Sequence, residues 1–150
     1  MDNYTPQLRN SQGHLQIFDP LRKRWVACTP EERVRQHFVH YLINILQYPA
    51  GRIGNEVGIT LNNTARRCDT LIYDDSALPL AIVEYKAPEV SITRTVFDQI
   101  LRYALALNAP WLIVSNGRHT VCARAIPGTP PRLQFTDHLP TYPEMLHQPT

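Results

Sequence analysis

Two short apolar segments separated by a polar loop constrain the fold of this chain more than any other feature. The segments are 70–73 (TLIY) and 80–86 (LAIVEYK), and the loop between them, 74–79, ends with Pro79. Apolar runs on either side of such a loop are typical of a β-hairpin. Both segments are apolar on both faces, so we expect helices or loops to cover each side of the sheet.

The remaining pattern predicts a mixed sheet with helices packed on it. Thr29-Pro30-x-Glu32 reads as a capping box that opens a helix, which should end near Gln47 because Pro49 follows. A second helix is expected from near Thr95, with Asp98 at the capping-box position, and Pro110 closes it. Strands are predicted over 56–61, 111–114 and 120–126 in addition to the hairpin. This order indicates an α/β (α+β mixed) domain.

The 150 residues suit one folded domain with two flanking segments. We expect the domain over 29–126, after an N-terminal segment 1–28 in which 15–18 forms a short strand. Six of the 13 prolines follow Ile126, so 127–150 is predicted as an irregular tail with a strand at 132–135.

Several classes of protein are excluded by what the sequence lacks. Only two residues are lysines, Lys23 and Lys86, and neither lies in the Gly-Lys-Ser/Thr motif that binds nucleotide phosphates. The three cysteines form no Cys-x-x-Cys pair, which argues against a disulfide framework or a zinc site. No signal peptide or membrane-spanning stretch is recognisable, so we expect a cytoplasmic protein.

Charged residues at the end of the predicted hairpin form the candidate site. If Tyr73 pairs with Leu80, the residue numbers of each pair sum to 153 and Asp69 lies opposite Glu84. Opposed residues project from the same face, about 5 Å apart. Lys86 joins this face because side chains alternate along a strand.

Two adjacent carboxylates repel each other, and a shared proton, an arginine or a divalent cation would relieve this repulsion. Mg²⁺ suits paired carboxylates and leaves coordination positions for water and phosphate oxygens. A neighbouring ammonium group can orient water or stabilise charge that develops at phosphorus. Asp69, Glu84 and Lys86 therefore indicate metal-assisted phosphodiester hydrolysis. The alternative is structural: an ion pair between Glu84 and Lys86, with Asp69 capping the neighbouring strand.

Other candidate residues have adequate structural explanations. Gln99 and Tyr103 lie four residues apart on one helix face, where they could be a polar flank. Capping the first helix explains Glu32, although its carboxylate could also reach a metal. Glu56 is a weaker alternative ligand.

Five segments in order carry a resemblance to a known family: 30–35 (PEERVR), 67–69 (RCD), 84–88 (EYKAP), 99–104 (QILRYA) and 112–117 (LIVSNG). They resemble the PD-(D/E)xK nuclease superfamily, and more narrowly the N-terminal nuclease domain of type I restriction enzyme restriction subunits, with its Gln-x-x-x-Tyr motif. Cys68 departs from the proline of the superfamily motif.

The resemblance implies a restriction-endonuclease-like fold, a central mixed β-sheet flanked by helices. It implies that Asp69 and Glu84 bind Mg²⁺, with Mn²⁺ as a substitute, and that Lys86 assists the attacking water. Gln99 and Tyr103 would hold DNA or order the site, and Glu32 would supplement the metal ligands.

Three expectations about partners and activity follow. DNA is the expected substrate, and a motor or specificity subunit would act in trans because these 150 residues hold no motor motif. The net charge of only +2 favours a partner that supplies DNA affinity. The alternatives are a catalytically silent nucleic-acid or protein interaction module, and a Holliday-junction or repair nuclease.

Overall fold

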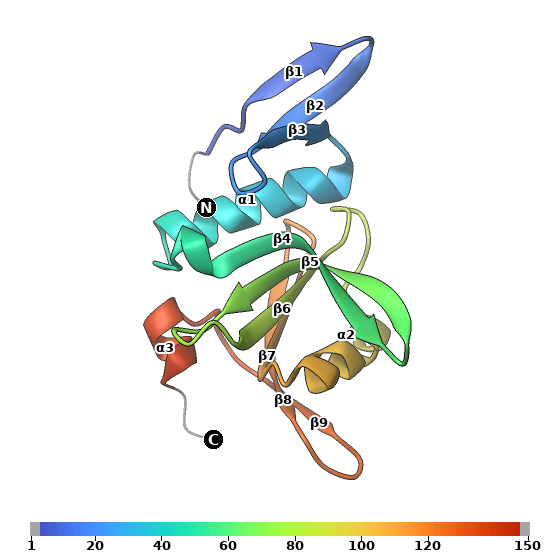
Figure 1. The fold of residues 1–150 in the computed structure, drawn as a ribbon, viewed down its shortest axis with the longest axis vertical. Helices are drawn as coiled ribbons and strands as arrows, with labels where there is room; N and C mark the ends of the chain where they lie inside the picture. Colours follow the sequence, from blue (N-terminus) through green and yellow to red (C-terminus); the bar gives the residue numbers. More distant parts are fainter. Residues whose placement is uncertain (1–3, 148–150) are drawn as a thin grey trace.

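The computed structural model describes residues 4–147, which form two β-sheets and three α-helices (Figure 1). The smaller sheet contains β1 (Leu8–Ser11), β2 (His14–Asp19) and β3 (Arg24–Ala27). The larger sheet has the order β4 (Ile53–Leu61), β5 (Thr64–Tyr73), β6 (Pro79–Tyr85), β7 (Trp111–Ser115), β8 (Thr120–Ile126), β9 (Arg132–Phe135). The helices are α1 (Pro30–Asn44), α2 (Arg94–Leu107) and α3 (Tyr142–Leu146), and a short 3₁₀ turn, η1 (Ala50–Arg52), precedes β4.

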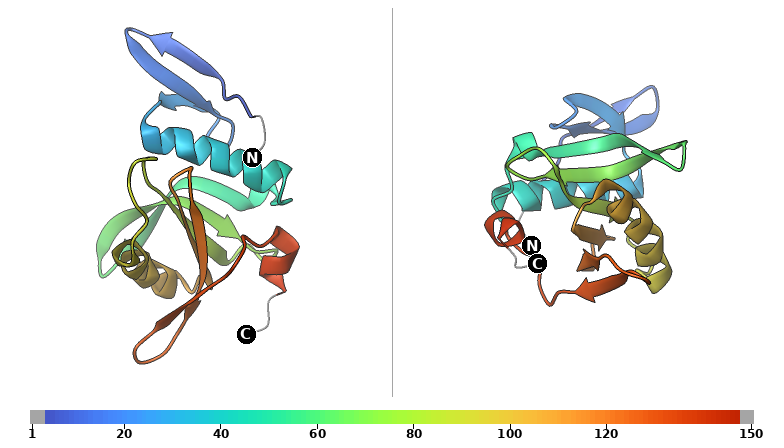
Figure 2. Two further views of the ribbon diagram at one scale, coloured as in Figure 1. Left: turned by 180° about the vertical axis from the view of Figure 1, so that it is seen from behind. Right: turned by 60° about the horizontal axis from the view of Figure 1, so that its bottom comes forward.

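The six-stranded sheet is mixed, as the sequence predicts. Only the β6–β7 pair is parallel, and α2 makes the crossover between these two strands. The longer helices cover opposite faces of the sheet (Figure 2). Apolar residues of α1 pack on one face and those of α2 on the other, which confirms that both faces of the hairpin strands are buried.

The first helix begins where the sequence predicts and ends earlier. The Thr29 hydroxyl accepts the Glu32 N–H at 3.0 Å, but Glu32 returns no bond to Thr29, so the capping box is half formed. The helix ends at Asn44 instead of near Gln47. Gln47 adopts φ 66°, and this turn buries Leu46 while the neighbouring Ile45 stays 48% exposed.

The second helix is capped differently from the expectation. It begins at Arg94 after an N-cap Thr93 whose side chain makes no capping bond. Asp98 pairs with Arg94 on the surface at 3.2 Å instead of capping the helix. The helix ends at Leu107, where Asn108 takes a left-handed conformation ahead of Pro110.

The β5–β6 hairpin has the predicted register at the end that carries the charged residues. Thr70, Leu71 and Ile72 pair with Val83, Ile82 and Ala81, so the residue numbers of these pairs sum to 153. Tyr73 pairs with Pro79 and not with Leu80, because the register shifts between Ile72 and Tyr73.

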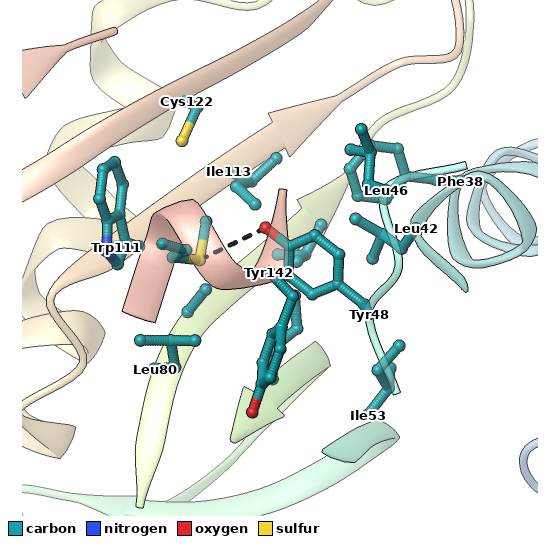
Figure 3. Packing of buried hydrophobic residues seen from close by; sticks show 14 of the residues in the cluster. Phe38, Leu42, Leu46, Tyr48, Ile53, Leu80, Trp111, Ile113, Cys122 and Tyr142 are labelled. Carbon is teal, nitrogen blue, oxygen red and sulfur yellow. Dashed lines mark hydrogen bonds between the residues drawn. The ribbon is translucent and has the colours of Figure 1, made fainter. Parts of the chain in front are cut away.

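Residues after 126 contribute to the core, which the sequence pattern did not indicate. The strand at 132–135 is as predicted, but α3 was not expected. Figure 3 shows Tyr142 among the buried residues that line the α1 face, and the Tyr48 hydroxyl donates to the Met145 sulfur at 3.5 Å. Tyr48 also donates to the Pro140 carbonyl at 2.8 Å, so hydrogen bonds hold the C-terminal segment against the domain. The boundaries at 28 and 126 stay predictions.

No helix within residues 4–147 combines the length and the apolar character needed to cross a membrane.

Candidate functional site

Asp69 and Glu84 lie where the β5–β6 ladder ends. The last ladder pair is Thr70–Val83, and the Asp69 carboxylate then accepts the Tyr85 N–H at 2.9 Å. The Asp69 side chain thus accepts the β6 N–H that a backbone carbonyl of β5 would accept if the ladder continued. This bond fixes the Asp69 carboxylate beside Glu84, the neighbour of Tyr85 in β6, and brings together the two predicted metal ligands.

The two carboxylates share a partly buried environment that disfavours two negative charges. Burial is the main reason that the pKa of Glu84 rises to about 8, and the adjacent Asp69 carboxylate raises it further. Burial also raises the pKa of Asp69, although the Tyr85 N–H and the Arg35 guanidinium act in the opposite direction. Among residues 4–147 no cation lies within ion-pair distance of either carboxylate.

Four of the predicted site residues line one cavity of about 270 Å³ between the end of β6 and α2. Glu84 and Lys86 come from the β6 end, and Gln99 and Tyr103 from successive turns of α2. The other lining residues are Val96, Ile100 and Arg102. Lys86 follows the last residue of β6, and its N–H donates to the Ser115 carbonyl at 3.0 Å, which fixes its backbone.

Glu32 does not line this cavity, and its carboxylate is engaged elsewhere. Arg35 donates to both of its oxygens, at 2.9 and 2.6 Å. Arg22 and Gln36 add bonds of 2.8 and 3.0 Å. Burial would raise the pKa of Glu32, but these bonds outweigh it and hold the pKa below its ordinary value. With four donors around it, Glu32 is an ion-pair partner of the arginines in this structure.

Arg35 and Glu56 are the site neighbours that sequence reasoning missed or ranked low. Arg35 donates from one nitrogen to Glu56 at 2.9 Å and to the Asp69 carbonyl at 2.7 Å. Glu56 lies between the ladder pairs Asn55–Thr70 and Val57–Cys68, next to Asp69, and has φ 56°. Arg35 therefore fixes the β5 backbone at the site. The Glu32-x-x-Arg35 spacing on one helix face was the available signal.

Mg²⁺ fits this donor set only as a partly hydrated ion. Within residues 4–147 no three His, Cys, Asp or Glu side chains gather as a metal group. Asp69 and Glu84 would supply two carboxylates, deprotonated when the ion binds, and Mg²⁺ in proteins commonly keeps several waters and binds substrate phosphates. The chemistry of the site is thus compatible with this ion.

Comparison with known proteins identifies a family. Residues 30–140 match the model of the family described as the type I restriction enzyme R protein N terminus. The match begins at the first residue of α1 and covers the whole six-stranded sheet together with α2, while β1–β3 and α3 lie outside it. No curated protein matches the chain.

Proposed function

The chain belongs to the family of type I restriction enzyme R protein N termini, and from this premise we propose that it is a Mg²⁺-dependent endonuclease domain of PD-(D/E)xK type that hydrolyses phosphodiester bonds in DNA. The observation that supports this proposal best is the gathering of Glu84, Lys86, Gln99 and Tyr103 around one cavity, with Asp69 beside Glu84.

Each residue has a role that its position allows. Asp69 and Glu84 would hold Mg²⁺, which when bound polarises a phosphate oxygen and lowers the pKa of a water molecule. Lys86 would orient the attacking water and stabilise the charge that develops at phosphorus. Gln99 and Tyr103, on the wall of the cavity formed by α2, would hydrogen-bond the DNA backbone and position the scissile bond.

Plasmid cleavage by variants tests this proposal. Purified protein would be incubated with supercoiled plasmid and Mg²⁺ or Mn²⁺, beside Asp69→Ala, Lys86→Ala and the control Glu31→Ala. Glu31 is an exposed carboxylate on α1 that lines no part of the cavity. Cleavage by the wild type and the control, lost in the other two variants, is expected. Equal cleavage by all four proteins would contradict the proposal.

Metal binding separates the enzyme from the alternative of a catalytically silent interaction module. That alternative is favoured by the lack of a three-ligand metal group among residues 4–147. Titration calorimetry with Mn²⁺ should give a single site that Glu84→Ala abolishes and Glu31→Ala retains. A wild type that binds no Mn²⁺ would favour the silent module.

The proposal extends to partners and location. Because the family is named for a subunit of a restriction enzyme, we propose assembly with a motor or specificity subunit that brings DNA to the site, in the cytoplasm. Pull-down with and without a DNA fragment, compared between wild type and the Asp69→Ala variant, would test whether assembly needs the site.

A further inference from the structure

The outer face of the β1–β3 sheet is a surface that the proposed function does not use. Neighbouring strands align Arg9 with Gln16 and Phe18 with Trp25, and His14 lies on the same face. The opposite face packs toward α1, where Ile17 and Asp19 are fully buried. We refer to Arg9, His14, Gln16, Phe18 and Trp25 as the outer face. Figure 1 shows this sheet projecting from the rest of the molecule beyond α1.

Two half-buried aromatic rings and a guanidinium form the centre of the outer face. The ring centroids of Phe18 and Trp25 lie 5.3 Å apart at an interplanar angle of 67°. The Arg9 guanidinium carbon lies 4.5 Å from the centroid of Trp25. Gln16 accepts the Arg9 Nε–H at 2.7 Å, which holds the guanidinium over the indole. The sheet therefore presents a preformed aromatic and cationic surface.

The N-terminal segment carries the net charge of the whole chain. Residues 1–28 contain four of the 15 basic residues and two of the 13 acidic ones, which equals the full formal charge of +2. One of the two acids, Asp19, is buried and paired with Arg22. Lys23 is exposed in the turn between β2 and β3, whereas Arg24, the first residue of β3, lies opposite Asp19 and so on the other face of the sheet.

We propose that the outer face binds single-stranded nucleic acid. Unpaired bases stack on aromatic rings and on arginine guanidinium planes, and each base contributes its own stacking energy. Bases would stack on the Arg9–Trp25 pair and on Phe18, while Lys23 contacts phosphates. A duplex hides the faces of its bases inside the stack, so it offers this surface only its phosphates. Binding here requires neither a metal nor the carboxylates of the nuclease site, so it stands or falls separately from the proposed function.

Tryptophan fluorescence gives a direct readout at the surface itself. The chain has two tryptophans, and Trp111 is only 2% exposed on β7. Addition of an oligothymidylate of about 15 nucleotides, close to common site sizes, in EDTA should therefore quench emission from Trp25. Anisotropy of the labelled oligonucleotide gives the dissociation constant in parallel. The same length of RNA and of duplex DNA, at equal salt, completes the set.

Variants separate stacking from general charge attraction. Trp25→Ala should weaken single-strand binding about tenfold or more, whereas Trp25→Phe, which keeps a ring, should retain most of it. Arg9→Ala should also weaken binding and lower the slope of affinity against salt by about 0.7. Arg132→Ala is the matched control, because Arg132 is an exposed arginine on the edge strand β9.

The outcomes decide the proposal in both directions. Preference for DNA and RNA single strands over the duplex, lost in Trp25→Ala and kept in Arg132→Ala, supports it. Preference for single-stranded DNA over RNA, or the reverse, also supports it and shows which sugar the surface prefers. Equal affinity for duplex, equal weakening by Arg9→Ala and Arg132→Ala, or absence of binding overturns it. If Trp25→Ala unfolds, as circular dichroism would show, Arg9→Ala and Trp25→Phe carry the decision.

Discussion

The buried side chain of Arg35 connects three elements of the fold. Its guanidinium contacts both Glu32 oxygens on α1, Glu56 on β4 and the Asp69 carbonyl on β5. Burial alone would lower its pKa, but the carboxylates of Glu32 and Glu56 raise it further above its already high ordinary value. A lysine has one nitrogen and could not reproduce this fork of bonds.

Removing this guanidinium should destabilise the protein strongly. Arg35→Met leaves the buried Glu32 carboxylate with fewer partners, so we expect the free energy of unfolding to fall by about 3–5 kcal/mol in urea titrations. The double variant Glu32→Gln/Arg35→Met should recover part of this loss, because the buried position 32 then carries no charge, and only the more exposed Glu56 loses its guanidinium partner. Arg94→Met, which removes an exposed pair with Asp98, should change stability by less than about 1 kcal/mol. Additive losses in the double variant would contradict this explanation.

At the scale of elements, local patterns predicted what local interactions determine. The bounds of β8 and β9 and the start of α1 agree with the structure, because turn residues and a capping threonine define them. The predicted end of α1 was wrong, because the actual end depends on a left-handed turn at Gln47 that buries Leu46 against distant strands. The helix α3 was missed for the same reason: it is stabilised by burial against residues such as Tyr48, far away in sequence.

In the candidate site, too, the sequence predicted the local features and missed the contacts between distant residues. Pairing numbers that sum to 153 placed Asp69 beside Glu84, since strand register is a local property of the hairpin. The bonds from Arg35 to Glu56 and Asp69 span 21 and 34 residues, and hydrophobic periodicity holds no information about them. The capping box predicted for Glu32 accounts for its backbone N–H bond to Thr29 and not for the bonds of its carboxylate.

Helix capping provides a matched pair of variants at this scale. Thr29→Ala should lower the free energy of unfolding by about 1 kcal/mol, because it removes the acceptor for the Glu32 N–H. Thr93→Ala, at the N-cap of α2, should cost much less, since the Thr93 side chain makes no capping bond. Urea titrations of both variants measure the difference. Equal losses would indicate that side-chain capping is not what distinguishes the two helix starts.

At the scale of the whole molecule, one polar network joins the two sheets beneath the candidate site. Asp19 on β2 accepts a bond of 3.0 Å from Asn55 on β4, and Asn55 accepts one of 2.7 Å from Thr70 on β5. The Thr70 hydroxyl in turn accepts a hydrogen bond of 2.9 Å from the Tyr85 hydroxyl on β6. Arg22 extends the network from Asp19 to Glu32 and so to α1. The small sheet is thereby part of the same folded unit as the strands that carry Asp69 and Glu84.

The ionisation of this network should set the stability of the molecule in acid. Burial would raise the pKa of Asp19, but bonds from Arg22, Asn55 and the Leu21 N–H outweigh it and lower the pKa below its ordinary value. A carboxylate with a lowered folded pKa contributes stability that is full above its unfolded pKa, about 3.9, and is lost as the pH falls through the folded value. The free energy of unfolding should therefore decrease as the pH is lowered below about 4.

Urea titrations across this pH range, for wild type and Asp19→Asn, measure the contribution of Asp19. Asp19→Asn should be less stable than wild type at pH 7, and the two proteins should converge in acid, because protonation removes from the wild type the same charge that the variant lacks. Asp98→Asn is the control: its exposed pair with Arg94 contributes little, so its curve should run parallel to that of the wild type. If Asp19→Asn also stays parallel to wild type down to the lowest pH, the charge of Asp19 does not hold the two sheets together, and hydrophobic burial of Ile17 against α1 must do so instead.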